Sequence, residues 1–314
     1  MNLKSAILGL AVGDALGVPV EFMSREMLQK NPVKIMREFG THKQPKGTWS
    51  DDSTMTFCLM ETLAQGYDLR DLGDRFVRWY RQAYWTPYKN VFDMGNTTRQ
   101  AIIRLETQQI EPTQAGGKDR QSNGNGSLMR ILPLLFYTKE LPINQRWKIT
   151  RAVSALTHGH FVACFACFIY LEYARLLLEG HDKWKAYQLM LDLVNGFTTT
   201  QSFLEGDLHS FHRIFQAPKQ LAQLPKNQIN SGGYVIDSLE ASFWCLLNGN
   251  NYSETVLSAV NLGRDTDTTG AITGGLAGIL YGESGIPLTW ISYLARLNDI
   301  LDLIERLDDK LEAQ

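Results

Sequence analysis

The spacing of apolar residues is the feature that most constrains how this chain can fold. Apolar side chains recur at three- and four-residue intervals through most of the sequence, and the segment "DSLEASFWCLLNG" shows this with Leu239, Phe243, Leu246 and Leu247. This interval places the side chains on one face of an α-helix. The two-residue alternation of a half-buried strand is almost absent. The sequence therefore predicts an all-α protein of about ten or more helices.

Glycines mark the ends of many of these periodic segments. A helix ends most easily on a residue with a left-handed backbone, and glycine adopts that conformation without the penalty of a Cβ. We therefore expect left-handed caps at five positions, namely Gly66, Gly180, Gly249, Gly263 and Gly282.

The polar segments that interrupt the helical pattern are few, and they cover residues 31–50, 84–96, 111–127 and 197–233. No linker rich in Pro, Gly or Ser separates two apolar regions, and no repeat of fixed period is present. We therefore expect one compact multi-helix domain over residues 1–314. Segment 197–233, which contains His209 and His212, is a candidate cover for a site on the substrate-facing surface.

The amino-acid composition indicates which kinds of binding partner and which cellular compartment to expect. With 44% hydrophobic and 20% charged residues, the chain has the composition of an ordinary globular protein. The net charge is -2 and no long basic run is present, so a nucleic-acid partner is disfavoured, although a local basic groove would escape this count. The four cysteines lie within apolar runs, which is typical of small buried residues in a reducing compartment, so we expect a cytoplasmic protein.

Two apolar stretches of the sequence have features of a targeting or membrane segment. The stretch around residues 161–179 contains Glu172 and Arg175, so we interpret it as a buried helix and expect no membrane partner. The N-terminal stretch after Lys4 has some features of a signal peptide. Asp14 interrupts it early and no clear cleavage site follows, so export is the less favoured alternative.

Two segments far apart in the sequence share an unusual acidic pattern. "GTWSDDSTM" contains Ser50, Asp51 and Asp52, and "GRDTDTTG" contains the set Asp265, Asp267 and Thr268. Each precedes an apolar helix, where a hydroxyl can cap the helix and its dipole favours negative charge, so each alone has a purely structural explanation. Together, four carboxylates meeting at one place would repel one another unless cations neutralised them.

The ligand chemistry of such a meeting point would consist of oxygen atoms only. Carboxylate and hydroxyl oxygens without a His/Cys cluster favour a hard ion such as Mg²⁺ or Mn²⁺ over zinc. A calcium loop of the EF-hand type is disfavoured, because the twelfth position from Asp265 is Leu276 rather than a bidentate glutamate.

Four further features carry candidate chemistry. Glu21 is a third acidic candidate, with a solvated loop residue as the alternative, and Asp14 in an apolar helix is typical of a buried hydrogen-bonding partner that fixes loops. The turn "SNGNGSLMRILPL" offers successive backbone N–H groups that could accept a phosphate, although it lacks the G-K-[ST] ending of a nucleotide-triphosphatase loop. In "THGH", His158 and His160 are more typical of a helix terminus than of a metal site.

Taken in order, the motifs form a recognisable series. "GLAVGDALGVPVEF", "GTWSDDSTM", "DMGNTTR", "NGNGSLMRILPL", "THGH", "SGGYVIDSLEASFW" and "GRDTDTTGAITGGLAGILYG" run from about residue 5 to 282. The series resembles that of the ADP-ribosylglycohydrolase family, which includes dinitrogenase-reductase-activating glycohydrolase and the ADP-ribosylarginine and ADP-ribosylserine hydrolases. Each motif alone is modest, but their order and spacing make the resemblance specific.

The resemblance implies an all-α fold with two divalent cations, Mg²⁺ or Mn²⁺, in a cleft that holds ADP-ribose. By motif, one side of the cation pair would be held by Ser50, Asp51 and Asp52, and the other by Asp265, Asp267 and Thr268. Glu21 would be the mobile acid near the bond that is cleaved. The expected contacts with the diphosphate and distal ribose of ADP-ribose are made by the backbone of Gly124, Asn125, Gly126 and Ser127. The distal ribose would also meet Asp93, Gly95 and Asn96. His158 would contact the phosphate side, and Tyr234 would stack on the adenine.

The sequence departs from the pattern of the family in two ways. Ser50 and Ser53 replace the more usual threonines, and serine keeps the ligand oxygen. Arg264 stands where a glycine or another small residue often precedes the aspartate, so it adds charge beside the site and could change the preference for substrate.

The function that the resemblance implies is hydrolysis of the N-glycosidic bond of ADP-ribosylated arginine on a protein, with release of ADP-ribose. Water would attack C1″ while Glu21 or Asp52 moves the proton, and the sequence does not decide between these two carboxylates. Release of ADP-ribose from serine, a nucleic-acid base or an O-acetyl group is the enzymatic alternative. The non-enzymatic alternative is a silent ADP-ribose binder or a partner that blocks a toxin by contact; the intact acidic pairs argue against a silent binder.

Overall fold

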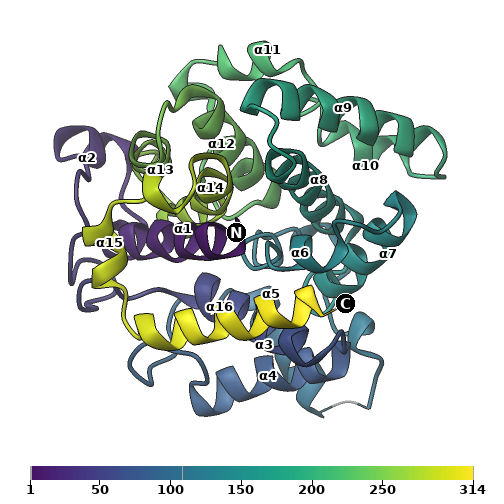
Figure 1. Cartoon of the computed structure of the whole chain (residues 1–314). Coiled ribbons are helices and arrows are strands. Elements are labelled where there is room, and N and C mark those ends of the chain that lie inside the picture. The colour runs from purple at the N-terminus through teal and green to yellow at the C-terminus, as the bar shows by residue number, and fades with distance from the viewer. Residues whose placement is uncertain (1, 108, 314) are drawn as a thin grey trace.

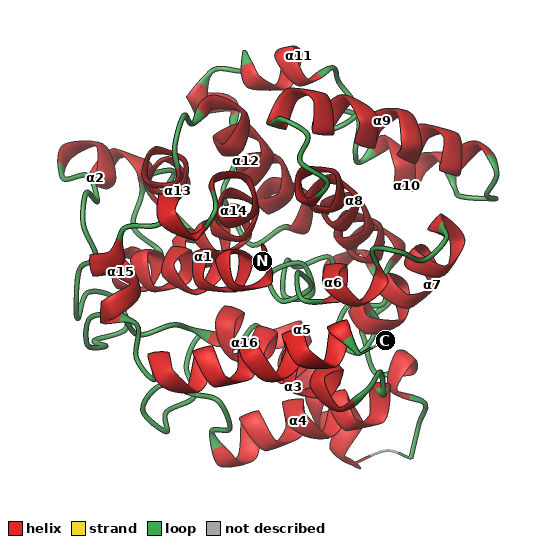
Figure 2. Ribbon diagram, viewed as in Figure 1, coloured by secondary structure: helices red, strands yellow, loops and turns green. Residues whose placement is uncertain are grey.

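All the regular secondary structure longer than an isolated bridge is helical in the part of the chain that is described. The computed structural model describes residues 2–107 and 109–313, and within these ranges it contains α-helices, short 3₁₀ turns and three isolated bridges but no strand (Figures 1 and 2). The predicted all-α fold is therefore confirmed.

In chain order the α-helices are α1 Asn2–Gly17, α2 Arg25–Lys30, α3 Asp51–Gln65, α4 Leu69–Gln82, α5 Asn96–Thr107, α6 Leu134–Thr138, α7 Ile143–Ser154, α8 Phe161–Leu178, α9 Lys183–Thr199, α10 Glu205–His209, α11 Pro218–Ala222, α12 Val235–Asn248, α13 Tyr252–Val260, α14 Thr266–Tyr281, α15 Leu288–Tyr293 and α16 Leu297–Glu312. The 3₁₀ turns are Val18–Val20, Pro112–Gln114, Arg120–Ser122, Lys226–Gln228 and Glu283–Gly285.

The helices α1 and α14 form the centre of the molecule, with the other helices arranged around them (Figure 1). Glycines let their backbones touch: a Cβ built on Gly13 would lie 2.0 Å from the carbonyl oxygen of Gly270, and one on Gly9 would lie 2.4 Å from that of Gly274. No larger side chain fits at such a separation. The small residues of both helices therefore serve this close packing.

A second packing centre surrounds Trp147 of α7. Its ring makes edge contacts with Phe165 and Phe168 of α8, and with Phe197 and Phe203 at the end of α9 and just beyond it. Aromatic contacts of this kind add to the burial of apolar surface. They attach the start of segment 197–233 to α7 and α8.

The helix ends agree with the glycine pattern at four of the five positions. Gly66, Gly180, Gly263 and Gly282 have positive φ angles of 141°, 89°, 81° and 71°. The prediction for Gly249 was wrong, because it has φ -81° and ψ 149°. Its lack of a side chain has another cause: a Cβ at this position would lie 2.0 Å from the hydroxyl oxygen of Thr255.

Two helical segments, Leu3–Val20 and Phe161–Leu178, have the length and apolar composition of a membrane span. The fold buries 94% of the first and 83% of the second inside the molecule. The core helices of water-soluble proteins pass the same test, so length and composition give little support for membrane insertion.

Candidate functional site

A cavity of about 540 Å³ collects residues from segments that are far apart in the sequence. Its volume lies within the range of small-molecule sites. Its described lining consists of Glu21, Phe22, Asp51, the segment 93–98, the segment 124–126, Met129, His158, Gly233, Asp265 and Thr268. One part of the lining, called the acidic end below, therefore consists of carboxylates, and another part is formed by a glycine-rich turn and an imidazole.

The packing of α1 against α14 positions the acidic end. Gly17 closes α1, and a Cβ on it would lie 2.3 Å from the backbone of Asp267, so the start of α14 rests directly on the end of α1. Asp14, one turn earlier in α1, accepts hydrogen bonds from the backbone N–H groups of Ser50 and Ser53 at 2.9 and 3.0 Å, and from the hydroxyl of Ser53 at 2.6 Å. These bonds fix the start of α3, which agrees with the expected role of Asp14 in fixing loops.

The two acidic segments meet at this point. The hydroxyl of Thr268 donates to Asp52 Oδ2 across the two helix N-termini at 3.2 Å, and Ser50 Oγ donates to the same oxygen at 2.9 Å. Two groups of carboxylates have oxygen atoms within 4.8 Å of one another, namely Asp14, Asp52 and Asp267, and Asp51, Asp52 and Asp93. Asp52 belongs to both groups and therefore links them.

Burial and mutual repulsion make these carboxylates difficult to ionise. Burial, followed by the charges of the neighbouring acids, raises the pKa values of Asp51, Asp52 and Asp267 well above their ordinary value. The same causes raise the pKa of Asp93 to about 7. Burial raises the pKa of Asp14 to about 6, and its hydrogen bonds oppose the shift. Positive charge placed among these groups would reverse the shifts.

The residues present fit a hard divalent cation. Three buried carboxylate oxygens, Asp52 Oδ1, Asp265 Oδ1 and Asp267 Oδ2, have no hydrogen-bond partner among the described residues. An unpaired buried oxygen with negative charge is costly unless a cation or another donor satisfies it. Oxygen donors of this kind are the preferred ligands of Mg²⁺ and Mn²⁺.

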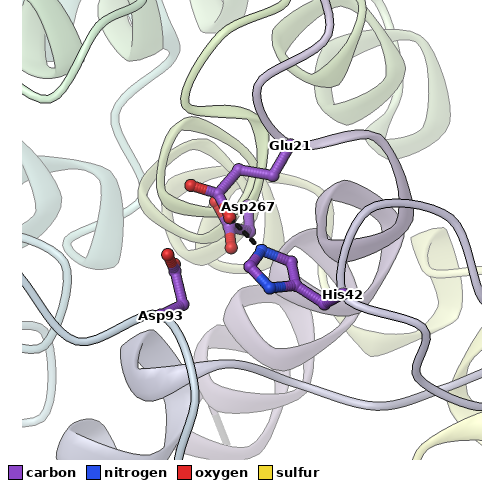
Figure 3. Close-up of side chains that lie close together, drawn as sticks. All are labelled: Glu21, His42, Asp93 and Asp267. Carbon is purple, nitrogen blue, oxygen red and sulfur yellow. Dashed lines mark hydrogen bonds and ion pairs between the residues drawn. The ribbon is translucent and has the colours of Figure 1, made fainter.

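Glu21 lies at the rim of the acidic cluster beside a residue that the sequence analysis missed. Figure 3 shows Glu21, His42, Asp93 and Asp267 gathered together, with His42 Nε2 directed at the Glu21 carboxyl group, to which it is hydrogen-bonded. Burial and the charges of Asp93, Asp265 and Asp52 raise the pKa of Glu21 to about 10. Burial lowers the pKa of His42, so without added positive charge the pair is a neutral hydrogen bond.

The loop that carries His42 is anchored beside Glu21. The backbone N–H of Thr41 donates to the carbonyl of Pro19 at 3.1 Å, and its hydroxyl donates to the carbonyl of Glu21 at 2.7 Å. Gly40 has φ +50°, and a Cβ there would lie 1.8 Å from the carbonyl oxygen of Pro19. No motif in the polar segment 31–50 identifies His42, because its role depends on this contact with a different part of the chain.

The same cavity is also lined by His158 and the glycine-rich turn. A Cβ on Gly126 would lie 2.8 Å from His158 Cε1, and one on Gly124 would lie 3.3 Å from His158 Nε2, so the ring edge faces this turn. Asn125 holds the turn against the acidic end, since its side-chain amide donates to Asp265 Oδ2 at 2.8 Å. The turn and the imidazole thus line the same end of the cavity.

A buried chain of hydrogen bonds determines which ring nitrogen of His158 carries the proton. Arg130 Nη2 donates to the hydroxyl oxygen of Thr157 at 2.8 Å, and the same oxygen lies 2.9 Å from His158 Nδ1. Arginine can only donate, and Nδ1 is the one hydrogen-bond acceptor found for the Thr157 hydroxyl among the described residues. Thr157 therefore donates to Nδ1, and the N–H of the neutral ring is on Nε2.

Most of the predicted site residues line this cavity, and some lie elsewhere. Those that line it are Glu21, Asp51, Asp93, Gly95, Asn96, Gly124, Asn125, Gly126, His158, Asp265 and Thr268. Ser50, Asp52 and Asp267 are buried and do not line it. The sequence did not predict that Asp93 would share the acidic cluster with Asp51 and Asp52.

Three further expectations concern residues beside the described lining. The side chain of Ser127 is fully buried and contacts Ser154 Oγ and Cys167 Sγ, so the contact expected from this residue can come only from its backbone. Tyr234 follows the lining residue Gly233, is 42% exposed, and is not itself part of the described lining. Of segment 197–233, only Gly233 belongs to that lining, so most of the segment does not cover the cavity.

Comparisons with known proteins agree with this arrangement. The family model described as ADP-ribosylglycohydrolase matches residues 2–314. The chain is 32% identical to the ADP-ribosylarginine hydrolase Tri1 of Pseudomonas putida, over 98% of this chain and 78% of that protein. It is 29% identical to the ADP-ribosyl-[dinitrogen reductase] glycohydrolase of Rhodospirillum rubrum, over 92% and 88% of the two chains.

A solved structure gives the same result for the fold. A chain of an "ADP-ribosylglycohydrolase-related protein complex" superposes with a TM-score of 0.81 at 32% sequence identity, covering 99% of this chain and 98% of the other. Fold, motif order and sequence identity therefore agree over nearly the full length. The chain belongs to the ADP-ribosylglycohydrolase family.

Proposed function

We propose that this protein hydrolyses the N-glycosidic bond between ADP-ribose and an arginine side chain of a modified protein, releasing ADP-ribose. The observation that carries the proposal is the meeting of two acidic helix N-termini, with three unpaired buried carboxylate oxygens, beside a cavity that a glycine-rich turn and an imidazole also line. The similarity to the ADP-ribosylarginine hydrolase of Pseudomonas putida supports this linkage, and the similarity to the ADP-ribosyl-[dinitrogen reductase] glycohydrolase of Rhodospirillum rubrum supports a modified protein as the substrate.

The acidic end and the glycine-rich turn of the cavity suit different parts of the ligand. Phosphates are anionic, so they belong at the glycine-rich turn, where the turn 124–126 and His158 line the wall. The ribose that carries the arginine then lies at the acidic end. Two divalent cations, Mg²⁺ or Mn²⁺, would be held there by Ser50, Asp51, Asp52, Asp265, Asp267 and Thr268. When bound, such cations orient hydroxyl groups and lower the pKa of water.

The protein groups at the acidic end supply the proton transfer. In the reaction, a water oxygen forms a bond to C1″, the bond from C1″ to the guanidine nitrogen breaks, and the nitrogen leaves with the electron pair. Glu21 lines the cavity at this end and is hydrogen-bonded to His42. Positive charge bound among the acids lowers the pKa of Glu21, so that its carboxylate can accept the proton of the water and pass it to the nitrogen that leaves. Asp52 is the alternative base, but it is buried and lies outside the described lining.

The test is the release of ADP-ribose from defined linkages. Purified protein is incubated with ADP-ribosylated arginine, serine and DNA-base substrates, in Mg²⁺, in Mn²⁺ and in EDTA, and free ADP-ribose is measured. We expect release from the arginine linkage that requires a divalent cation and is lost in Asp265→Asn and Asp267→Asn. Arg70→Gln, an exposed substitution on α4, serves as the control.

Two results would contradict the proposal. Full activity of both aspartate variants in EDTA would show that the acidic cluster is not needed. Release from serine or a base, but not from arginine, would assign the same cavity to a different leaving group.

A further inference from the structure

A second cavity, of about 470 Å³, lies directly beside the first. It is lined by residues at the start of α2, by the segment around 227–230 and by Leu262 and Arg264. Phe22 lines both cavities, and its side chain is 67% exposed. The two cavities are therefore neighbours with one aromatic side chain between them.

Two backbone segments, 22–23 and Arg264, are hydrogen-bonded to each other between the two cavities. The N–H of Phe22 donates to the carbonyl of Arg264 at 2.6 Å, and the N–H of Arg264 donates to the carbonyl of Met23 at 2.8 Å. Phe22 and Arg264 both have a left-handed backbone, with φ angles of 62° and 66°. Glu21 and Asp265, their direct sequence neighbours, line the first cavity. The second cavity thus adjoins the acidic end of the first, where the proposed function places the bond to be cleaved.

The second cavity contains two guanidinium groups without an ionic partner. The three side-chain nitrogens of Arg25 donate hydrogen bonds to the backbone carbonyls of Leu262, Lys226 and Ile229. These bonds join the walls of the cavity. Neither Arg25 nor Arg264 forms a salt bridge within the described residues, and Arg264 is exposed. The repulsion between them contributes, after burial, to a lowered pKa of Arg25. A carboxylate placed here would relieve that repulsion.

Other charged groups near this cavity do not remove its preference for an anion. The acids that act on Arg264 are Glu26, which is exposed at the start of α2, and Asp237 of α12. Lys226 adds a further positive charge near Arg25. Within the described lining, the two arginines Arg25 and Arg264 accompany one acid, Glu26, so the lining has a net positive charge. The amides of Asn227 and Asn230 can bind the backbone of an extended peptide.

We propose that the second cavity binds the polypeptide next to the modified arginine, with Arg264 contacting an acidic side chain of that polypeptide. This inference rests on the proposed function, because it takes the modified side chain to leave the first cavity past Phe22. Arginine suits this contact, since its planar group pairs with a carboxylate through two hydrogen bonds. The exposed ring of Phe22 offers an apolar surface to the stem of the modified side chain.

The experiment compares three substrates that carry the same linkage. The first is a small ADP-ribosylated guanidine without a polypeptide, the second is an ADP-ribosyl-arginine peptide with acidic neighbours, and the third is the same peptide with those acids changed to amides. The values of kcat/KM are measured for the wild type, Arg264→Gln and Arg264→Glu. Arg70→Gln on α4 is the matched control for loss of an exposed arginine.

We expect the wild type to prefer the acidic peptide over the amide peptide by about tenfold, which corresponds to about 1.4 kcal/mol. Arg264→Gln removes this preference, Arg264→Glu reverses it, and both change the small substrate by less than about threefold, which is about 0.6 kcal/mol. Arg70→Gln changes none of the three values. This pattern requires contact between Arg264 and the acidic neighbours.

Other outcomes overturn the inference in ways that can be told apart. An equal loss on all three substrates would mean that Arg264 acts through Asp265 on the first cavity. Equal rates for both peptides in the wild type would exclude recognition of acidic neighbours. If the wild type cleaves none of the three substrates, the proposed function itself fails and this inference fails with it.

Discussion

The substitution Thr157→Val tests the assignment of the His158 proton. Valine has nearly the shape of threonine but lacks the hydroxyl that accepts from Arg130 at 2.8 Å and donates to His158 Nδ1. Thr157 and Arg130 are both fully buried, so water does not replace the lost group. We expect the ring of His158 to lose its fixed tautomer, with little change in the shape of the cavity.

The size of the effect follows from the two hydrogen bonds. Leaving a buried donor of Arg130 without this partner costs about 1–3 kcal/mol of folding free energy. A hydrogen bond from the ring to a charged phosphate is worth about 1.5–3 kcal/mol, so its complete loss would weaken ADP-ribose binding by about 10- to 150-fold. Thr157→Ser keeps the hydroxyl and should stay near the wild type in both respects.

The assay combines spectroscopy with calorimetry. The ¹⁵N chemical shifts of the imidazole nitrogens report which one is protonated, and His158→Gln identifies the resonances of this ring. We expect a protonated Nε2 in the wild type and in Thr157→Ser, and a mixture in Thr157→Val. The Kd for ADP-ribose is measured by calorimetry on the wild type and the two Thr157 variants, and among these it should rise only in Thr157→Val.

Titration of the same ring gives an independent check. Burial, followed by the charge of Arg130, lowers the pKa of His158 to about 3. The ring therefore stays neutral between about pH 5 and 8, and no titration near the ordinary histidine pKa of about 6.5 should appear. A wild-type ring protonated on Nδ1, or a Thr157→Val protein that binds ADP-ribose as tightly as Thr157→Ser, would refute the reasoning.

Three further predictions concern the core and the acidic cluster. Gly13→Ala should lower the free energy of unfolding by about 3 kcal/mol or more, because the added Cβ would lie 2.0 Å from the carbonyl oxygen of Gly270. Urea titration measures this change, and a near-neutral effect would contradict the close packing of α1 and α14. Mn²⁺ should raise the thermal midpoint of unfolding of the wild type but not that of Asp267→Asn. In EDTA, Asp267→Asn should be more stable than the wild type, since it has one buried acid fewer. Scanning calorimetry measures the thermal midpoints of the two proteins under both conditions. In EDTA the free energy of unfolding of the wild type should fall as the pH rises from about 4 to about 7. The folded-state pKa values of Asp14 and Asp93, about 6 and about 7, lie above the ordinary value of 3.8. The unfolded chain therefore loses these protons at a lower pH than the folded protein does. Denaturant unfolding at several pH values checks this, and stability that rises over this range would contradict it.

Features that depend on near neighbours in the chain could be predicted from the sequence. The helical period gave the all-α fold, because three- and four-residue spacing is a local property of a helix. The acidic pairs were found for the same reason: Ser50 caps α3 and accepts from the N–H of Asp52, so the motif and its structure lie within one turn. Glycine caps were predicted with one error, since Gly249 owes its small size to Thr255 rather than to its backbone angle.

Features that depend on contacts between distant segments were decided only by the tertiary structure. His42 reaches Glu21 because its loop is hydrogen-bonded to the chain beside Pro19, and no pattern near His42 indicates this. Ser127 lies in the predicted glycine-rich motif, yet its side chain turns inward to Ser154 and Cys167.

The same distinction separates the two cavities. The sequence determined which residues could serve the first cavity, because carboxylates, hydroxyls and glycines at helix starts have a chemistry that spacing reveals. The packing of α1 on α14 decided that Asp14 and Asp267 meet, and the pairing of Phe22 with Arg264 decided that a second cavity stands beside them. A local pattern determines the conformation of one turn, whereas charges and rings separated by hundreds of residues come together only when the whole core is packed.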